Sequence, residues 1–461
     1  MISQAILKEI SQIINPEHVI TSPDKMAEYG SDATKLEFVP DGVVFPGNSQ
    51  EVSRILTLAS KKVFPVVPRG AGSGMSGGAL PVRGGLVMAM TRFDRILAID
   101  TDNLICRVEP GVITAHLQEA VEKLGLFYPP DPASLHISTL GGNVAECAGG
   151  LRAVKYGVTR DYVLGLEVVL PTGEILKTGV ETAKGVAGYD LTRLIVGSEG
   201  TLAVITAITF RLIPKPATQK TMIAFFPDVT SAVATVSEII RSRIIPVTLE
   251  FMDRHCLNCV RQEMGLPIPG DAGAMLLIEV DGDQVIVDKE SQEVRSVCSR
   301  MGTLSFEAAD GKEEAEMLWE ARRNVSPSLL QLRPHKISED IVVPRSRMDR
   351  LVAFLDDVEK KYGLPIPAFG HAGDGNIHVN IMLDKNRAHE LENAGKIVKE
   401  LFEKVIEMNG TITGEHGIGI TKAPYLEMEI PRAGLQLMSR IKAAFDPQGI
   451  LNPGKIFHHR I

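Results

Sequence analysis

Short apolar runs interrupted by glycine dominate residues 42–210 and predict a region rich in β-strands. Apolar runs of about four to eight residues between turn formers are typical of strands. Apolar residues recur with helical spacing at 51–61 and 113–124, which predicts a helix in each place. Residues 6–14 form an amphipathic helical pattern that lacks the charged start and apolar core of a signal peptide. The predicted strands are 42–46, 63–68, 85–90, 166–170 and 200–205.

A different order of elements begins after Pro214 and Pro216, which mark a domain boundary. The pattern predicts strand, helix and strand, then the same order again, at 221–226, 231–243, 246–251, 274–280, 285–300 and 303–306. Two such units in series predict a ferredoxin-like antiparallel sheet with helices on one face. A strand, a helix and a hairpin follow within 337–382, and then a helix at 387–408. The last segment, 434–457, is predicted to be a helix that closes on the run 446–455.

Composition narrows the class of protein. The chain has 49 Lys+Arg and 57 Asp+Glu, a formal net charge of -8, which argues against a nucleic-acid binder. No apolar run approaches the roughly 18 residues of a membrane span. Five cysteines in 461 residues fit a reducing compartment and predict a cytoplasmic protein. Cys256 and Cys259 form a lone C-x-x-C, interpreted as buried thiols with a redox pair as the alternative.

Glycine is in excess, with 42 residues, and it gathers in clusters. The first cluster carries five glycines between Gly70 and Gly78, and it includes a formal G-x-G-x-x-G. The Rossmann motif requires a helix directly afterwards, whereas Pro81 and a strand-like run follow here. A glycine loop of this kind lets backbone N–H groups approach an anion closely, which favours a phosphate or pyrophosphate cradle over a plain turn.

Three further clusters lie at 129–150, 156–161 and 196–205. In this order the four clusters resemble FAD-linked oxidases of the vanillyl-alcohol-oxidase type, within them the branch of glycolate oxidase flavoprotein subunits and D-lactate dehydrogenases. The similarity extends from about residue 40 to the sequence Leu-Asn-Pro-Gly-Lys that ends at Lys455. It implies an α+β fold, with a two-subdomain FAD-binding domain and a ferredoxin-like antiparallel-sheet substrate domain. The expected segments are 1–216 for FAD, 217–425 for substrate and metal, and 426–461 returning to the FAD domain.

The resemblance also implies residues that bind FAD. Residues 69–76 would hold the pyrophosphate, the second cluster would line the flavin, the fourth would lie near the adenosine end, and Asn452 would reach the isoalloxazine. Some relatives attach FAD through a histidine in the first loop, where this chain has Ser73, so noncovalent FAD is expected. The implied set is Pro68, Arg69, Gly70, Ala71, Gly72, Ser73, Gly74, Ser76, Pro130, Asp131, Thr139, Gly142, Asn143, Ala145, Tyr156, Val163, Glu199, Gly200, Ile205 and Asn452.

Histidines gather around a predicted hairpin. Asp374 and Gly375 form a two-residue turn signal, which would make His371 and His378 a direct cross-strand pair, with Asn380 on the same face. A second hairpin-like turn at 414–419 offers Glu415 and His416. Two histidines and a glutamate suit a catalytic Zn²⁺ or Fe²⁺, with Mn²⁺ as a further option. The alternative is a set of satisfied polar residues at a sheet end, and the resemblance favours the metal ligands His371, His378 and Glu415.

Arg322 and Ser326 are four residues apart on a predicted helix and share a face. From spacing alone Arg322 is an ordinary surface arginine, but the resemblance implies that it grips the substrate carboxylate. Lys336 is a further candidate for the same anion, and Arg323 could be confused with Arg322. Tyr189, outside these elements, would either face the flavin or lie in the core.

The resemblance implies oxidation of a small D-2-hydroxy acid, D-lactate or glycolate, to the 2-oxo acid. His416 would act as base, Arg322 and Asn380 would be the other catalytic residues, and Arg322, Ser326, Lys336 and Asn380 would bind substrate. Alternatives are a D-2-hydroxyglutarate dehydrogenase, a metal-dependent hydrolase and a non-catalytic flavin-binding subunit. The chain has no iron–sulfur motif, so electrons would pass to an iron–sulfur subunit, an electron-transferring flavoprotein or a quinone, with the protein peripheral to the membrane through such a partner. A homodimer is left open.

Overall fold

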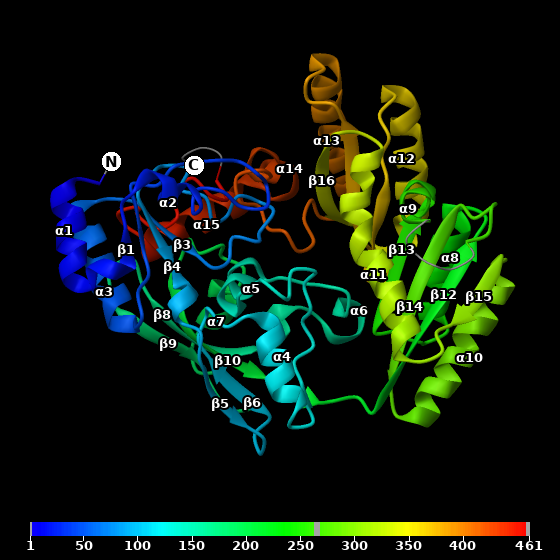
Figure 1. The fold of residues 1–461 in the computed structure, drawn as a ribbon, viewed down its shortest axis with the longest axis horizontal. Coiled ribbons are helices and arrows are strands. Elements are labelled where there is room, and N and C mark those ends of the chain that lie inside the picture. The colour runs from blue at the N-terminus through cyan, green and yellow to red at the C-terminus, as the bar shows by residue number, and fades with distance from the viewer. Residues whose placement is uncertain (1, 262–267, 458–461) are drawn as a thin grey trace. The chain divides into compact units, whose positions relative to one another are not determined.

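The computed structural model describes residues 2–261 and 268–457, shown in Figure 1. The chain forms two compact units, and neither is one continuous segment. The first unit contains Met1–Gly149, Val158–Lys215 and Glu415–Ile461, and the second contains Gly150–Gly157 and Pro216–Gly414. The boundary at 215/216 lies at the proline pair, where the composition changes.

The first unit begins with a small four-stranded sheet in the order β1-β2-β4-β3. Strands β2, β4 and β3 run parallel, and β1 is antiparallel at the edge. Helix α3 begins at an Asn48 cap, and its Val52, Ile55 and Leu56 are fully buried in the same core as the strands. The elements are α1 (Gln4–Ile13), β1 (Val19–Ile20), α2 (Pro23–Ala27), β2 (Gly42–Val44), α3 (Ser49–Lys62), β3 (Val66–Arg69) and β4 (Leu86–Ala89).

A five-stranded antiparallel sheet, in the order β5-β6-β10-β8-β9, forms the second half of this unit. Seven of the eight residues of β10 are buried, as expected for a central strand. Two sheets in one unit correspond to the expected two-subdomain arrangement. The elements are β5 (Ile96–Asp100), β6 (Ile105–Val108), α4 (Thr114–Glu122), β7 (Leu126–Phe127), α5 (Leu140–Glu146), β8 (Val163–Val169), β9 (Ile175–Gly179), α7 (Leu191–Ile195), β10 (Val204–Arg211) and β11 (Ile213–Pro214).

The last segment of the chain returns to this first unit. It contains α14 (Leu426–Glu429) and α15 (Arg432–Phe445), so the closing helix ends directly before the run 446–455, as predicted. The helix stops because Asp446 turns its carboxylate back to accept hydrogen bonds from the Ile450 and Leu451 N–H groups. Lys442 donates to the carbonyls of Thr201 (2.7 Å) and Leu451 (2.8 Å), which ties the segment to the unit.

The second unit is built on a seven-stranded sheet in the order β15-β12-β14-β13-β17-β18-β16. The first four strands have the order of a ferredoxin-like sheet, and β17, β18 and β16 extend it at the β13 edge. Each neighbouring pair is antiparallel. The strands are β12 (Thr218–Phe226), β13 (Thr248–Asp253), β14 (Ala274–Gly282), β15 (Ser305–Ala308), β16 (His335–Val342), β17 (Ala368–His371) and β18 (Asn376–Leu383).

Helices cover both faces of this sheet, so the prediction of helices on one face was wrong. Helices α8 and α10 pack on β12 and β14, whereas α9 and α11 form a core with Ile223 and Phe225 of β12. Residues 221–226 of β12 are all buried, which requires cover on both sides of the strand. The helices are α6 (Ala153–Tyr156), α8 (Val229–Arg241), α9 (Arg254–Val260), α10 (Gln284–Arg300), α11 (Lys312–Ser328), α12 (Met348–Tyr362) and α13 (Ala388–Glu407).

The structure bears on two further expectations, the lack of a membrane span and the burial of the two cysteines of the C-x-x-C. Within residues 2–261 and 268–457, no helix is both long and apolar enough to cross a bilayer. Cys256 and Cys259 are free, buried thiols on α9, in agreement with the interpretation as buried cysteines. Burial raises the pKa of the Cys256 thiol well above its usual value, which keeps it protonated and unreactive.

Candidate functional site

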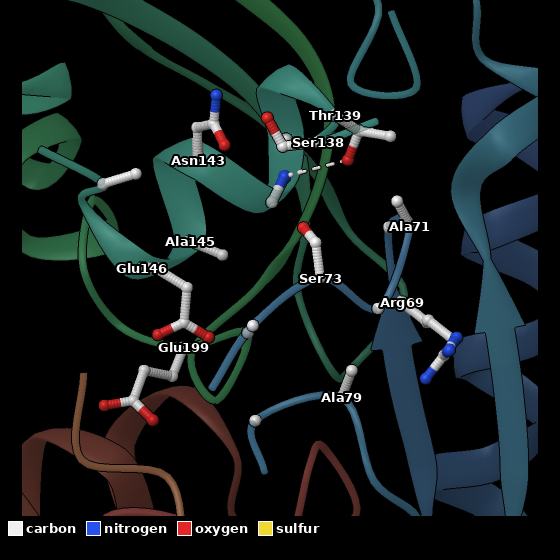
Figure 2. Close-up of a pocket in the computed structure, with 18 of the residues that line it drawn as sticks. Arg69, Ala71, Ser73, Ala79, Ser138, Thr139, Asn143, Ala145, Glu146 and Glu199 are labelled. Carbon is white, nitrogen blue, oxygen red and sulfur yellow. Dashed lines mark hydrogen bonds between the residues drawn. The ribbon is translucent and has the colours of Figure 1, made fainter. Parts of the chain in front are cut away.

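A pocket of the first unit lies where the loop after β3 meets the start of α5 and the turn before β10 (Figure 2). Figure 2 shows Ala71 and Ser73 on the loop, facing Ser138 and Thr139 at the beginning of α5, and Arg69 at the end of β3 with its side chain pointing away from them. Many of the residues expected to bind FAD line it. These are Pro68, Arg69, Gly70, Ala71, Gly72, Ser73, Gly74, Thr139, Gly142, Asn143, Ala145, Glu199, Gly200 and Ile205.

The loop after β3 is a cradle that requires glycine. Gly72 and Gly77 have φ angles of +74° and +81°, in the left-handed region that residues with a side chain rarely adopt. A Cβ at Gly72 would lie 2.1 Å from Nη2 of Arg69. Arg69 is buried, and its Nη1 has no hydrogen-bond partner among the described residues. A bare backbone beside an unsatisfied guanidinium fits the pyrophosphate of FAD.

The Gly72→Ala variant should lose FAD, because alanine pays about 1–2 kcal/mol in the left-handed region and its Cβ displaces Arg69. We expect FAD affinity to fall about tenfold or more, measured from the ratio of flavin to protein absorbance after gel filtration. Gly125→Ala is the matched control, because Gly125 also has a left-handed φ of +71° but has nothing within 4 Å of its Cβ and is not among the residues that line the pocket. Equal flavin retention in both variants would contradict this role of Gly72.

Helix α5 holds the other side of the pocket. The Thr139 hydroxyl caps it by accepting from the Gly142 N–H (3.3 Å). The Asn143 side chain donates to the Thr114 hydroxyl (2.7 Å), and Asn143 is buried. A Cβ at Gly141 would lie 2.4 Å from Cβ of Pro110, so the helix begins against a rigid neighbour. These contacts hold in place the start of α5, whose residues the resemblance implies at the flavin.

Glu146 and Glu199 are neighbouring carboxyl groups that line the pocket together with Glu415, and the sequence analysis missed Glu146. Glu199 accepts from the Ile418 (2.8 Å) and Gly419 (2.6 Å) N–H groups. A Cβ at Gly417 would lie 2.3 Å from Oε2 of Glu146 and 3.2 Å from Oε1 of Glu199, so the two carboxyls are neighbours. Burial raises the pKa of both groups, and the charge of Glu199 raises that of Glu146 further. Glu146 lies inside the second glycine cluster, and this position was the signal in the sequence that could have identified it as a residue of the pocket.

Six of the expected FAD residues do not line the pocket. These are Ser76, Pro130, Asp131, Tyr156, Val163 and Asn452. Asn452 is buried, with its amide donating to the carbonyls of Gly78 (2.9 Å) and Glu199 (2.8 Å). Its Oδ1 accepts from Lys455 (3.0 Å), so it joins the C-terminal segment to the glycine loop. Tyr156 belongs to the second unit, where its hydroxyl donates to Asp281 (2.7 Å).

The second unit holds the two histidines of the predicted metal site at the β17–β18 hairpin. The predicted register was wrong: His371 pairs with Asn376, and His378 pairs with Phe369. The turn has four residues, 372–375, because the His371 carbonyl accepts from both the Asp374 (3.2 Å) and Gly375 (3.1 Å) N–H groups. His378 is therefore the diagonal neighbour of His371 on one face, and the ring centroids are 5.2 Å apart.

Asn380 follows His378 on the same face and is fully buried. Its amide donates to the His378 carbonyl (3.2 Å), and its Oδ1 has no hydrogen-bond partner in the part of the chain that the structure describes. A buried acceptor without a partner is costly unless a ligand satisfies it. Asn380 therefore fits a residue that contacts a bound group.

A buried carboxylate on β13, Glu250, joins Arg322 to His371, and the sequence analysis missed it. Its Oε2 accepts from Arg322 Nε (2.7 Å) and Nη2 (2.5 Å), and its Oε1 lies 2.6 Å from His371 Nδ1. Burial acts to raise the pKa of Glu250, but Arg322 and His371 outweigh it and lower that pKa to about 2. A glutamate within an apolar strand was the signal available in the sequence.

The face of α11 that carries Arg322 also carries Ser326. Lys336 of β16 donates to the Ser326 hydroxyl (2.5 Å) and carbonyl (2.9 Å), so the structure brings these two predicted residues together. Arg323 lies on the exposed side of the helix and pairs with Glu316. Tyr189 is 96% exposed in the structure, so its interpretation as a core tyrosine was wrong.

Glu415 and His416 belong to the first unit, where both line the pocket beside the glycine loop. Their turn, 414–419, is not a hairpin as predicted, because no strand flanks it on either side. A Cβ at Gly149 would lie 2.9 Å from Oε2 of Glu415, so Glu415 packs closely on the second glycine cluster. The expected base and the expected carboxylate ligand thus stand at the FAD pocket.

Comparison with known proteins identifies the family of the chain. Residues 40–179 match the FAD binding domain family, and residues 215–456 match the family described as FAD linked oxidases, C-terminal domain. The chain is 47% identical over 458 residues to a glycolate oxidase subunit of Bacillus subtilis, covering 99% of this chain and 97% of that one. It is 34% identical over 442 residues to a D-lactate dehydrogenase of Anaerostipes hadrus, covering 94% and 91%.

A solved structure shows the same fold. The structure of p-cresol methylhydroxylase with substrate bound aligns with a TM-score of 0.82 at 18% identity, covering 99% of this chain and 97% of that one. The resemblance seen in the glycine clusters is thereby confirmed over both units. With an FAD-binding domain in its first part and the oxidase C-terminal domain in the rest, the chain belongs to the FAD-linked oxidases.

Proposed function

We propose that this FAD-linked oxidase oxidises a small D-2-hydroxy acid, D-lactate or glycolate, to the 2-oxo acid. The observation that carries the proposal is the joining of Arg322 to His371 through Glu250 in the second unit. A guanidinium is the preferred partner of a carboxylate, and an imidazole is a common metal ligand. The 2-hydroxy acid has its hydroxyl on the carbon next to its carboxylate, so it needs both groups close together. The names of the two relatives support the same substrate class.

The donor set supports a divalent metal held by His371, His378 and Glu415. Two imidazoles and one carboxylate with open positions suit Zn²⁺ or Fe²⁺, with Mn²⁺ as the harder alternative. The 5.2 Å between the two histidine rings and the unsatisfied Oδ1 of Asn380 fit a bound group on that face of the hairpin. When bound, the metal would supply a Lewis acid for the substrate hydroxyl.

Each protein group has a distinct task in this proposal. Arg322 orients the substrate through its carboxylate, with Ser326 and Lys336 at the same face of α11. His416 takes the proton of the hydroxyl as general base, and Asn380 positions the substrate through its amide. Bound FAD supplies the acceptor for the C2 hydride at N5, and the glycine loop and α5 hold it without a covalent bond.

A monocarboxylate is favoured over D-2-hydroxyglutarate, because a second carboxylate would need a second cation. Arg323 pairs with Glu316 on the exposed side of α11, and Lys336 is already assigned to the first carboxylate together with Arg322. Glycolate and lactate differ by one methyl group, which gives only about 1–3 kcal/mol of discrimination. The hydrolase alternative loses its support, because the glycine loop belongs to an FAD-binding domain.

The visible spectrum of the purified protein tests the proposal. We expect yellow protein whose flavin absorbance bleaches anaerobically with D-lactate or glycolate, faster than with D-2-hydroxyglutarate and not with L-lactate. Removing metal with a chelator should stop the bleaching while the colour stays, and added Zn²⁺, Mn²⁺ or Fe²⁺ should restore it. Yellow protein that none of these acids bleaches would leave a non-catalytic flavin-binding subunit instead.

The reduced flavin would pass its electrons to a partner, because the chain carries no iron–sulfur motif. An iron–sulfur subunit, an electron-transferring flavoprotein and a quinone are the proposed acceptors. The name of the Bacillus subtilis relative, a subunit, supports a protein partner. Reoxidation by each acceptor after the anaerobic bleaching separates these cases in the same experiment.

A further inference from the structure

Glu250 lies at a fully buried position of the sheet, where an ionised carboxylate is costly unless it is paired. It lies in β13, between β14 and β17 in the sheet, and its side chain is fully buried. In the register of the sheet it stands directly opposite His371. Its two oxygens are divided, since Oε1 contacts His371 Nδ1 (2.6 Å) and Oε2 accepts from Arg322. One side chain therefore holds two residues that the proposed function uses for different tasks.

The contact with Glu250 determines which nitrogen of His371 can bind a metal. A carboxylate that accepts from a guanidinium is ionised and can only accept hydrogen bonds. Nδ1 of His371 must then carry the proton and donate it to Oε1, which leaves Nε2 as the nitrogen with the lone pair. Carboxylates that orient a metal-binding histidine in this way are a common feature of metal sites.

The same carboxylate also restrains Arg322. Its Nε and Nη2 both point to Glu250, and its guanidinium carbon lies 4.7 Å from the centre of the Phe369 ring. The planar group is thus held along one edge and on one face. Because Phe369 is in β17, two residues before His371, the arginine and the histidine are fixed to the same strand.

We propose that Glu250 is a positioning residue that sets the distance between the metal-binding histidine and the carboxylate-binding arginine. This inference rests on the proposed function. A fixed distance suits a substrate whose hydroxyl and carboxylate are on neighbouring carbons, and it discriminates against a 3-hydroxy acid. Glu250 thereby determines specificity for the 2-hydroxy position without touching the substrate.

Glu279 provides a matched control for the loss of a buried carboxylate. It lies in the adjacent strand β14, is also buried, and accepts from the Trp319 Nε1 (3.2 Å) and the Thr221 hydroxyl (2.7 Å). Trp319 is on α11, one turn before Arg322, so both glutamates hold the same helix to the same sheet. Of these two glutamates, Glu250 is the one that contacts a histidine of the predicted metal site, His371.

The test compares Glu250→Gln and Glu279→Gln with wild type, each purified with FAD. Zn²⁺ affinity is measured by competition with a chelator, together with KM and kcat for D-lactate and D-3-hydroxybutyrate. We expect Glu250→Gln to bind Zn²⁺ 10- to 100-fold more weakly and to lose much of its preference for D-lactate. Glu279→Gln should match wild type in both, whatever its thermal stability.

The outcomes separate this inference from the proposed function. Wild-type protein that binds no Zn²⁺ and is not reduced by D-lactate overturns both. Wild-type protein that does both, with a folded Glu250→Gln that equals it in Zn²⁺ affinity, overturns the positioning role alone. If Glu250→Gln does not fold by circular dichroism, Glu250→Asp takes its place, because it keeps the charge beside Arg322 and withdraws from His371. Unchanged Zn²⁺ affinity in Glu250→Asp would likewise reject the role.

Discussion

The His416→Ala variant is expected to bind FAD, remain yellow and lose reduction of its flavin by D-lactate or glycolate. His416 lines the FAD pocket, and in the proposed mechanism it takes the proton from the substrate hydroxyl. General-base catalysis contributes about 10²–10⁴-fold, so the rate of flavin reduction in stopped flow should fall by that factor. Substrate affinity should change little, because Arg322 provides the charge that binds the carboxylate.

His136→Ala is the control for this result. His136 lies in the second glycine cluster, is exposed, and is not among the residues that line the pocket. Its removal should leave both the colour and the rate unchanged. If His416→Ala reduces its flavin as fast as wild type, another group is the base.

The Arg322→Lys variant is expected to lose substrate affinity. Lysine keeps the positive charge beside Glu250 but cannot hold two parallel hydrogen bonds to a carboxylate, so the buried charges stay paired while orientation is lost. Losing one hydrogen bond between charged groups costs about 1.5–3 kcal/mol. We therefore expect kcat/KM to fall roughly tenfold or more, with much of the loss in KM.

Arg323→Lys, one residue further on, tests whether the position or the residue type matters. Arg323 is 48% exposed in its side chain and pairs with Glu316 on the surface, and such pairs contribute about 0–1 kcal/mol. Its kinetics should equal those of wild type. Equal losses at both positions would assign the effect to helix α11 rather than to a guanidinium at residue 322.

The elements of the fold were largely readable in the sequence because each has a local signal. The repeated order of strand, helix and strand after residue 216 reappears as the ferredoxin-like part of the sheet. The sequence did not reveal that helices also cover the second face of this sheet. The reason is that α9 and α11, which pack on β12, lie about 30 to 100 residues after it in the chain. The end of the closing helix was readable because Asp446 and Pro447 follow it directly in the sequence.

Some features of the candidate site were likewise predictable from the sequence, and others were not. The cofactor loop is visible in the sequence because its glycines cluster, and two of them, Gly72 and Gly77, adopt the left-handed backbone region that favours glycine. The hairpin at His371 was placed correctly but given the wrong register, because Asp374–Gly375 signals a two-residue turn while His371 accepts two N–H groups and widens it. Glu250 was missed because its partners lie 72 and 121 residues further along the chain.

The return of residues 415–461 to the first unit constrains how the protein is made. The carbonyls of Gly78 and Glu199 beside the glycine loop receive the Asn452 amide, which leaves the ribosome hundreds of residues after the loop itself. Residues 216–414 are continuous and can fold during synthesis, whereas the FAD-binding unit must wait for its last segment. The complete FAD pocket, which includes Glu415 and His416, can therefore form only after residues 415–461 have been synthesised.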